Sequence, residues 1–348
     1  MSPALGHFRV PARLIALLCL GAVALASCGT SPVVVKKTHL NGTPAISISV
    51  PLSSISCTLN DVCVAAGTAT DSAGPTSVAE FSSPKGNWFD LSLPTTSPTL
   101  VSSVACSGAE CLLGGSSPGH DLLLTFDSHG HTLASVTPPP DGIGVTALTC
   151  NATACGLIDT SATGEPRFSV SSDDGATWTN PTPLAWAKGD AITAFACGST
   201  LQCAVGVLSV SHEFSLYVTT DGGATWTVRT TPLSWTTLAS LSCVGQRCVG
   251  LASTNGSSLL VRSKTFTRTW KSVKLAQPSS ALACFSFNQC VVVGQRPSAK
   301  PWLATVHDNS ATDVDLRYVP SPLLGVACGS KVCAAIGVTT LVTDPAPA

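Results

Sequence analysis

The sequence has little charge, few aromatic side chains and almost no helical patterning. Only 11% of its residues are charged, and the formal net charge is −1. No basic patch or stripe is visible, so the sequence indicates no nucleic-acid partner. Aromatic residues make up 5% of the chain. Apolar residues at helical spacing are hard to find after residue 30, whereas abundant Thr, Ser, Val and Gly suit strands and turns.

Long apolar runs are also missing, except at the N-terminus. Arg9 and Arg13 precede an apolar run over residues 14–26. A basic start followed by a short apolar core is typical of a secretory signal. No later apolar run reaches the roughly 18 residues that a membrane-spanning helix needs. The sequence therefore predicts an exported protein.

The end of this apolar run, Leu-Ala-Ser-Cys at Leu25–Cys28, resembles a bacterial lipobox. The resemblance implies cleavage before Cys28 and a lipid on its thiol, and an ordinary signal peptide cut nearby is the alternative. We expect a signal peptide over 1–27, a lipidated cysteine with a tether over 28–43, and a folded domain over 44–348. The lipid would anchor the protein to the outer face of the bacterial cytoplasmic membrane, at the cell surface or in the periplasm.

The cysteines form a regular pattern. After Cys19 in the signal and Cys28, fourteen of the 16 cysteines remain. They fall into seven close pairs: Cys57/Cys63, Cys106/Cys111, Cys150/Cys155, Cys197/Cys203, Cys243/Cys248, Cys284/Cys290 and Cys328/Cys333. An even number of cysteines in an exported protein predicts disulfides. Zinc would need two pairs to converge on one site, and pairs so far apart in sequence make a metal site the poorer interpretation.

The pairs mark an internal repeat. Their first cysteines are spaced 49, 44, 47, 46, 41 and 44 residues apart. An apolar segment precedes the first cysteine of each pair, and a second apolar segment begins at the second cysteine. A third strand, such as 214–220, and a fourth, such as 225–232, follow in most units. Four short antiparallel strands in a unit of this length describe a propeller blade.

We therefore predict an all-β fold, a seven-bladed β-propeller of four-stranded antiparallel blades with one hairpin disulfide in each. The last unit lacks a fourth strand, and a surplus strand over 45–51 precedes the first unit. This N-terminal strand would complete the C-terminal blade and protect its edge. Each disulfide closes a short ring and is expected to contribute about 2 kcal/mol.

Two short boxes recur within the repeat, Ser171–Trp178 and Thr219–Trp226. Both have the pattern Ser/Thr-x-Asp-x-Gly-x-Thr-Trp. The glycine permits a positive φ, the aspartate can accept hydrogen bonds from turn amides, and the tryptophan can pack between blades. The residues concerned are Asp173, Gly175, Trp178, Asp221, Gly223 and Trp226.

These boxes resemble the Asp-box, or BNR repeat, of sialidase-type propellers, sortilin-like receptors and photosystem II assembly-factor-like proteins. Degenerate copies occur at 82–88, 126–132 and 263–270, the last of which keeps Ser, Thr and Trp but loses Asp and Gly. The resemblance implies that the box is a structural hairpin away from any substrate pocket.

The resemblance also raises the question of an enzyme. Sialidase chemistry, as the family implies, needs an arginine triad, a Tyr/Glu nucleophile pair and an acidic Asp. The chain after Cys28 has seven arginines, two tyrosines and four glutamates, and the family's Phe-Arg-Ile-Pro-type segment is missing. We assign no catalytic residue and no cofactor. A sialidase-type glycoside hydrolase is the alternative to a non-catalytic binding or scaffold module.

A binding face can be predicted from the loops that join strands two and three and from those between blades. These loops carry Trp186, Trp235, Glu165, Arg167, His212, Glu213, Arg296, Lys300 and Trp302. Exposed aromatic side chains beside charges are typical of recognition surfaces. The alternative is that the tryptophans only cover hydrophobic blade ends. The expected partner is a protein or a glycan, bound by a monomer. His129 and His131 are interpreted as part of a polar turn.

Overall fold

The computed structural model describes residues 38–345, apart from short segments at 41–42, 48–51, 72–73, 85, 94–98, 130–131, 153, 230, 232–234, 266–268, 309, 315, 317–318, 320 and 338–339. The predicted signal peptide, Cys28 and the tether as far as residue 37 lie outside the described residues. Within the described part, no helix is long and apolar enough to cross a membrane.

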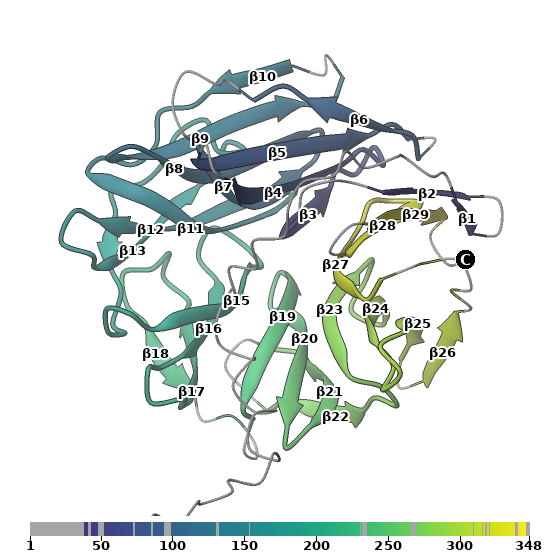
Figure 1. The fold of residues 1–348 in the computed structure, drawn as a ribbon. Helices are drawn as coiled ribbons and strands as arrows, with labels where there is room; N and C mark the ends of the chain where they lie inside the picture. Colours follow the sequence, from purple (N-terminus) through teal and green to yellow (C-terminus); the bar gives the residue numbers. More distant parts are fainter. Residues whose placement is uncertain are drawn as a thin grey trace, which may run out of the picture. The chain divides into compact units, whose positions relative to one another are not determined.

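Six antiparallel sheets of four strands follow one another along the chain, and we number them blades 1 to 6 (Figure 1). Blade 1 contains β3 (Ser54–Cys57), β4 (Cys63–Asp71), β5 (Gly74–Ser82) and β6 (Trp88–Leu91). Blade 2 contains β7 (Leu100–Ser107), β8 (Glu110–Ser117), β9 (His120–Asp127) and β10 (Thr132–Ser135). Blade 3 contains β11 (Gly142–Asn151), β12 (Ala154–Ser161), β13 (Pro166–Ser171) and β14 (Thr182–Pro183).

The other three blades repeat this order. Blade 4 contains β15 (Ala191–Cys197), β16 (Cys203–Leu208), β17 (Phe214–Thr219) and β18 (Thr227–Arg229). Blade 5 contains β19 (Thr237–Val244), β20 (Arg247–Thr254), β21 (Ser257–Ser263) and β22 (Lys271–Lys274). Blade 6 contains β23 (Ser279–Cys284), β24 (Gln289–Gln295), β25 (Pro301–His307) and β26 (Ser310–Val314). Because consecutive strands are antiparallel, the turn between a blade's first two strands and the turn between its last two lie at the same end of the blade.

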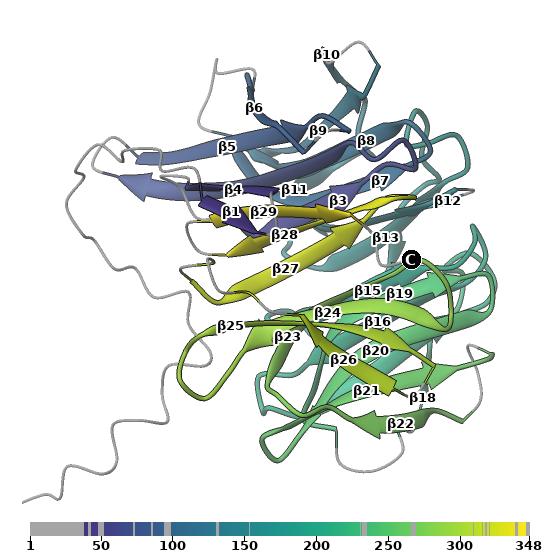
Figure 2. The ribbon, with the colours of Figure 1, turned by 90° about the vertical axis from the view of Figure 1, so that its right-hand side faces the viewer.

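The predicted fold class of seven four-stranded blades is wrong, because the described residues form only six blades with four strands. The remaining sheet has five strands, and we call it the closing sheet: β1 (Thr38–Leu40), β2 (Thr43–Ser47), β27 (Leu323–Cys328), β28 (Val332–Gly337) and β29 (Thr340–Pro345). β2 pairs with β29, so the two ends of the chain share one sheet, as Figure 2 shows for its purple and yellow strands.

The fifth strand comes from residues that the sequence interpretation placed in the tether. β1 pairs with β2 in a hairpin whose innermost partners are Leu40 and Thr43. The sequence between these partners is Asn-Gly, the dipeptide most typical of two-residue hairpins. The hairpin adds β1 to the edge of the closing sheet, which therefore has five strands and not the four predicted.

The first strands of the sheets lie next to one another in cyclic order, from β3 through β7, β11, β15, β19 and β23 to β27 and back to β3. Serine hydroxyls join several of these neighbours. Ser102 donates to the carbonyl of Val145 at 2.7 Å, and Ser280 donates to that of Leu323 at 2.6 Å. Each of these serines lies at a register shift in its strand, where a β-bulge turns a side chain toward the next sheet.

A carboxylate holds blade 1 against the closing sheet. Asp61 is 8% exposed and lies in the β3–β4 turn. Its side chain accepts hydrogen bonds from the Ser330 hydroxyl at 3.0 Å and from the amides of Lys331 and Val332 at 2.6 and 3.1 Å. These three donors satisfy the hydrogen-bonding needs of the buried carboxylate. The contact joins two parts of the chain that are about 270 positions apart in sequence.

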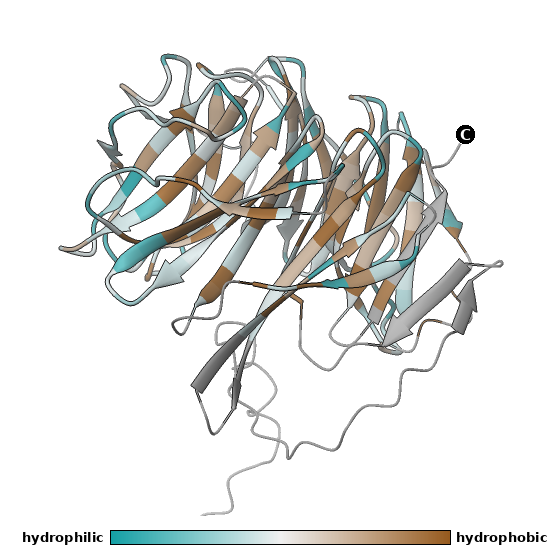
Figure 3. Ribbon diagram, turned by 90° about the horizontal axis from the view of Figure 1, so that it is seen from above, coloured by the Kyte–Doolittle hydropathy of each residue, from teal (hydrophilic) through white to brown (hydrophobic). Residues whose placement is uncertain are grey.

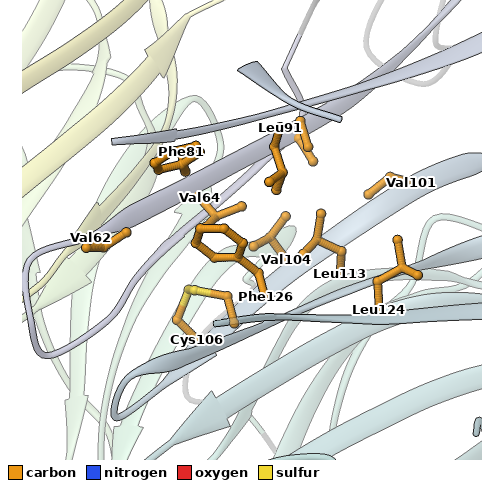
Figure 4. Close-up of a cluster of buried hydrophobic side chains, with 13 residues drawn as sticks. Val62, Val64, Phe81, Leu91, Val101, Val104, Cys106, Leu113, Leu124 and Phe126 are labelled. Carbon is orange, nitrogen blue, oxygen red and sulfur yellow. A yellow bond between two sulfur atoms is a disulfide. The ribbon is translucent and has the colours of Figure 1, made fainter. Parts of the chain in front are cut away.

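Most of the core lies between adjacent blades. Figure 4 shows one such cluster, in which Val64 and Phe81 of blade 1 pack against Leu113, Leu124 and Phe126 of blade 2. Figure 3 shows hydrophobic colour along the strands and hydrophilic colour on many of the loops that connect them. This pattern is expected for stacked sheets, which bury both of their faces against neighbours.

The predicted disulfides are confirmed. Seven bridges join the described cysteines in the expected pairs: Cys57–Cys63, Cys106–Cys111, Cys150–Cys155, Cys197–Cys203, Cys243–Cys248, Cys284–Cys290 and Cys328–Cys333. Each lies across a hairpin between the first and second strands of a sheet. The two cysteines of a pair are direct register partners, as Cys243 and Cys248 are in blade 5.

Burial shows that these cysteines belong to the core, although the sequence interpretation grouped them with the candidate site residues. The second cysteine of every pair is buried: Cys63, Cys111, Cys155, Cys203, Cys248 and Cys290 are each 0% exposed, and Cys333 is 7% exposed. Each packs within a hydrophobic cluster, such as Cys111 with Phe126, Cys155 with Leu157, Cys290 with Trp302 and Cys333 with Val326. The physical reason is that the second cysteine opens an apolar strand that lies between neighbouring sheets, so the bridges stabilise the fold.

Candidate functional site: a cationic cleft on blades 5 and 6

The two boxes fold into matching turns at the end of β13 and of β17. In the first, Asp173 accepts a hydrogen bond from the Thr177 amide at 2.9 Å and one from the Thr177 hydroxyl at 2.6 Å. The Ser171 hydroxyl accepts from the amide of Gly175 at 2.8 Å. In the second turn, Asp221, Thr225, Thr219 and Gly223 make the same contacts.

These hydrogen bonds lower the pKa of both aspartates. The first and largest cause is the threonine hydroxyl, from Thr177 for Asp173 and from Thr225 for Asp221, and the pKa of Asp221 falls to about 2. Gly223 has φ +89°, and a Cβ there would lie 2.3 Å from the ring of Phe168 in blade 3. The aspartates therefore use their acceptors within the turn, and the glycine lets the turn contact the preceding blade.

The tryptophans of the predicted binding face are not exposed, and this part of the prediction is wrong. Trp186 and Trp235 are each 6% exposed, and Trp302 is 1% exposed. Trp186 packs against Tyr217 and Trp226, while Trp235 packs against Phe214 and Trp270. The indole N–H of Trp302 donates to Asp313 at 3.0 Å. The physical reason is that these rings fill the space between neighbouring blades.

The charged members of that face are divided in the structure. Arg167 binds Asp159 through two hydrogen bonds of 2.8 Å, and Arg296 binds Asp313 at 3.1 Å. Glu165, His212, Glu213 and Lys300 are exposed. Within the described residues, no hydrogen bond or ion pair joins these four side chains. His129 is exposed and lies 3.5 Å from Asp127, whereas His131 lies outside the described residues.

The contact of Arg167 belongs to a buried acidic cluster between blades 2 and 3. Asp159 is fully buried, and Asp121 is 7% exposed. Burial, and then the nearby charge of Asp159, raise the pKa of Asp121 to about 7. The cluster therefore holds a proton near neutral pH, and the arginine keeps its own charge beside it. Among the described residues no group of three or more His, Cys, Asp or Glu side chains is arranged to hold a metal ion.

A cavity lies elsewhere, at the outer strands of blade 5. It has a volume of about 500 Å³. Its walls come from β21, β22, the turn between them, and the two turns of blade 6 that join β23 to β24 and β25 to β26. We call it the blade-5 cleft, and its lining residues are Leu260, Arg262, Lys264, Thr265, Thr269, Lys271, Val273, Phe287, Asn288 and Asp308.

The register of β21 and β22 determines the chemistry of this cleft. Leu260 pairs with Val273, and Arg262 pairs with Lys271, so two apolar and two cationic side chains lie on the same face. Like charges directly opposite each other on a sheet are destabilising. A carboxylate between them would relieve that repulsion, and no Asp or Glu is present on blade 5.

Arg262 lies at the boundary of the apolar part. Its guanidinium donates to the backbone carbonyl of Asn288 at 3.3 Å and lies 6.0 Å from the ring centre of Phe287. Burial lowers the pKa of Arg262, and the carboxylate of Asp308 acts in the opposite direction. The Nε–H of this arginine is buried and has no hydrogen-bond acceptor among the described residues.

A second hollow of about 280 Å³ lies on the other side of Phe287. Val244, Val249 and Phe285 supply its apolar walls, and Arg247 lies 5.8 Å from the Phe287 ring centre. Phe287 lines both hollows and has an arginine near its ring from each of them. A third cavity of about 300 Å³ is lined by the first strands of all the sheets and by their first cysteines.

The blade-5 cleft was not predicted from the sequence, and the prediction that no basic patch exists is wrong. Residues 222–307 contain nine of the 18 Lys and Arg residues and none of the 19 Asp and Glu residues. The net charge of −1 hides this asymmetry because the acids gather in the rest of the chain. Counting charge by segment would have found it, but the convergence of side chains from two blades needed the structure.

Comparisons with known proteins bear on the fold. No protein-family model matches the chain, and no curated protein matches it. Among solved structures, one described as YCF48 bound to D1 peptide is 14% identical, with a TM-score of 0.60, and the match covers 91% of this chain and 99% of that one. YCF48 from Cyanidioschyzon merolae is 12% identical, with a TM-score of 0.61 and coverage of 89% and 98%.

A GH74 xyloglucanase from Xanthomonas campestris is 13% identical, with a TM-score of 0.62, and the match covers 87% of this chain and 53% of the xyloglucanase. At such low identities the similarity reports architecture and not chemistry. The chain therefore has the β-propeller fold.

Proposed function

We propose that this protein is an exported, non-catalytic binding module at the bacterial cell envelope, anchored by a lipid on Cys28, and that it holds a protein partner in the blade-5 cleft. Disulfides persist in oxidising compartments outside the cytoplasm, and the seven hairpin bridges support export. The leader over 1–27 and the lipobox-like Leu25–Cys28 support the anchor. The two aspartate turns support a relation to Asp-box propellers.

The observation that carries the proposal is the chemistry of the cleft. Its volume of about 500 Å³ lies within the range of ligand-binding pockets. Apolar walls from Leu260, Val273 and Phe287 lie beside the cations of Arg262 and Lys271. The buried tryptophans of the earlier predicted face stabilise the blades, so they provide no comparable surface. A structural neighbour bound to a peptide shows that this fold can hold one.

Site-specific photo-crosslinking in the native envelope tests the proposal. A benzoyl-phenylalanine is placed at Thr269, which is exposed at the cleft, or at Val210, which is 73% exposed in the β16–β17 turn at the other end of its blade. We expect a discrete protein adduct from position 269 and not from 210. The adduct should disappear when Arg262→Gln and Lys271→Gln are combined.

The matched control removes two cations outside the cleft, by Lys188→Gln and Lys331→Gln, and should leave the adduct intact. The proposal would be contradicted by the same adducts from both positions, or by an adduct at 269 that persists in the Arg262/Lys271 variant. Purified partner should then bind the wild-type protein at least about tenfold more tightly than that variant, since truncating interface charges commonly costs this much.

A further inference from the structure

The blade-5 cleft and the second hollow together form one surface with two apolar depressions. Phe287 separates them and contributes to the lining of both. Val244, at the edge of the second hollow, is 67% exposed, whereas many apolar residues in the described part of the chain are buried. The two neighbouring depressions, of about 500 and 280 Å³, offer concave apolar walls to a bound chain.

The charge around these depressions has one sign. Arg247 and Arg262 flank Phe287, and Lys264 and Lys271 stand at the exposed rim. Within the described residues none of these four cations forms an ion pair. Asp308 is the one acid among the residues that line the two hollows, and it lies 3.3 Å from His307. The surface therefore retains an uncompensated positive charge.

The cationic pair is also retained at a cost to the sheet. Arg262 lies directly opposite Lys271, and a like-charge pair in that position weakens strand pairing. A residue pattern that disfavours the fold without a local compensation is expected at functional sites. An anionic ligand would remove the repulsion between these two cations.

We propose that the two hollows bind an acidic peptide segment of the partner, in which carboxylates contact Arg262, Lys264 and Lys271 while neighbouring apolar side chains enter the depressions on either side of Phe287. This inference rests on the proposed function, because it names the chemistry of the partner segment at the same site. An anionic membrane surface fits less well, since a planar layer of headgroups does not fill concave hollows with apolar walls.

Fluorescence anisotropy with four labelled decapeptides tests the inference on the exported protein. One peptide contains glutamate and leucine in equal number, and the others pair glutamate with serine, glutamine with leucine, or lysine with leucine. We expect the Glu–Leu peptide to bind about tenfold or more tightly than each of the others, because it alone satisfies both charge and apolar burial. Its affinity should fall as salt is raised, since salt screens exposed charges.

Three variants locate the binding. Arg262→Gln combined with Lys271→Gln should weaken the Glu–Leu peptide about tenfold or more, and Phe287→Ala should reduce its affinity toward that of the Glu–Ser peptide. Lys188→Gln combined with Lys331→Gln removes the same charge elsewhere and should change affinity less than about twofold. Equal thermal midpoints of the variants show that the fold is retained.

The inference is wrong if Glu–Ser or Gln–Leu peptides bind as tightly as Glu–Leu, or if the cleft variants bind Glu–Leu unchanged. Phosphatidylglycerol vesicles test the lipid alternative. The surface would be assigned to lipid if the wild type sediments with the vesicles, the Arg262/Lys271 variant does not, and the protein does not discriminate among the peptides. If crosslinking at Thr269 still captures a cleft-dependent partner while the peptides fail, the proposed function stands and only this inference falls. If the peptides fail and crosslinking at Thr269 also captures no cleft-dependent partner, the proposed function is wrong as well.

Discussion

The turns after β17 and β21 occupy equivalent positions in adjacent blades, and they differ in chemistry. In blade 4, Asp221 and Thr225 bind each other within the turn, and Gly223 brings the backbone against Phe168 of the preceding blade. In blade 5, the Ser263 hydroxyl donates to the carbonyl of Thr265 at 2.5 Å, and the sequence has neither the aspartate nor the glycine.

The consequence of this difference is a change of role. The blade-4 turn satisfies its own acceptors, and its carboxylate is committed to threonine. The blade-5 turn carries Lys264 and contributes Thr265 and Thr269 to the wall of a cavity. The same loop position thus stabilises the fold in one blade and lines the candidate site in the next. Loss of a structural motif in a repeat protein is a sign that the position has been released for another use.

The largest expected effect comes from adding a side chain at Gly223, where the blade-4 turn lies against Phe168. Gly223→Val should destabilise the protein by about 3 kcal/mol, from the positive φ and from overpacking against Phe168. Urea unfolding measures the change. The control is Gly256→Ala, where φ is +80° and no atom lies within 4 Å of the added Cβ, so only the backbone cost of about 1 kcal/mol applies. Equal losses in the two variants would contradict the packing role of the turn.

The second effect comes from restoring the lost motif in blade 5. Thr265→Asp combined with Thr267→Gly rebuilds the Asp-x-Gly spacing of 173–175 and places a carboxylate beside the cleft cations. Binding of the Glu–Leu peptide should weaken about tenfold, because the rebuilt turn carries a negative charge beside Arg262 and Lys271 and lowers their attraction for an acidic peptide. Anisotropy titration measures this change. Thr265→Asn with Thr267→Gly is the uncharged control, and equal weakening by both variants would show that charge is not the cause.

The smallest effects concern pH, and two carboxylates should give opposite signs. The pKa of Asp221 is lowered to about 2. Ionised Asp221 therefore stabilises the fold fully above pH 3.8, the ordinary pKa of aspartate, and this stabilisation is lost as pH falls through about 2. The pKa of Asp121 is raised to about 7. Protonated Asp121 therefore stabilises the fold fully below pH 3.8, and this stabilisation is lost as pH rises through about 7.

Thermal unfolding between pH 2 and 8 therefore separates Asp221→Asn from Asp121→Asn. The first variant should differ most from wild type above pH 4, and the second should improve relative to wild type as pH rises from 5 to 8. Parallel pH curves for both variants and the wild type would show that neither carboxylate is held as described.

Local features of this fold could be predicted from the sequence. The pairing of Cys243 with Cys248, and of the other close cysteines, follows from hairpins whose two strands and turn are contiguous in the chain. The hydrogen bonds of Asp173 and Asp221 also join residues within four positions of each other. Such contacts depend on spacing alone, and spacing is visible in the sequence.

Contacts between blades could not be predicted in the same way. The burial of Trp186 depends on Trp226 and Tyr217, and that of Trp235 on Trp270, which belong to other elements of the ring. The cleft likewise needs Phe287 of blade 6 to cover Arg262 of blade 5. Two other features could have been predicted from the sequence alone: the hairpin dipeptide at 41–42 and the span 222–307, which has no Asp or Glu.

The most direct test of the cleft as the binding site is hydrogen–deuterium exchange of the purified protein with and without a saturating amount of the Glu–Leu peptide. We expect slower exchange in fragments that cover 260–273 and 285–289, with no change in fragments that cover the opposite turns at 161–165 and 209–213. Protection of those opposite turns, with unchanged exchange at 260–273 and 285–289, would contradict it.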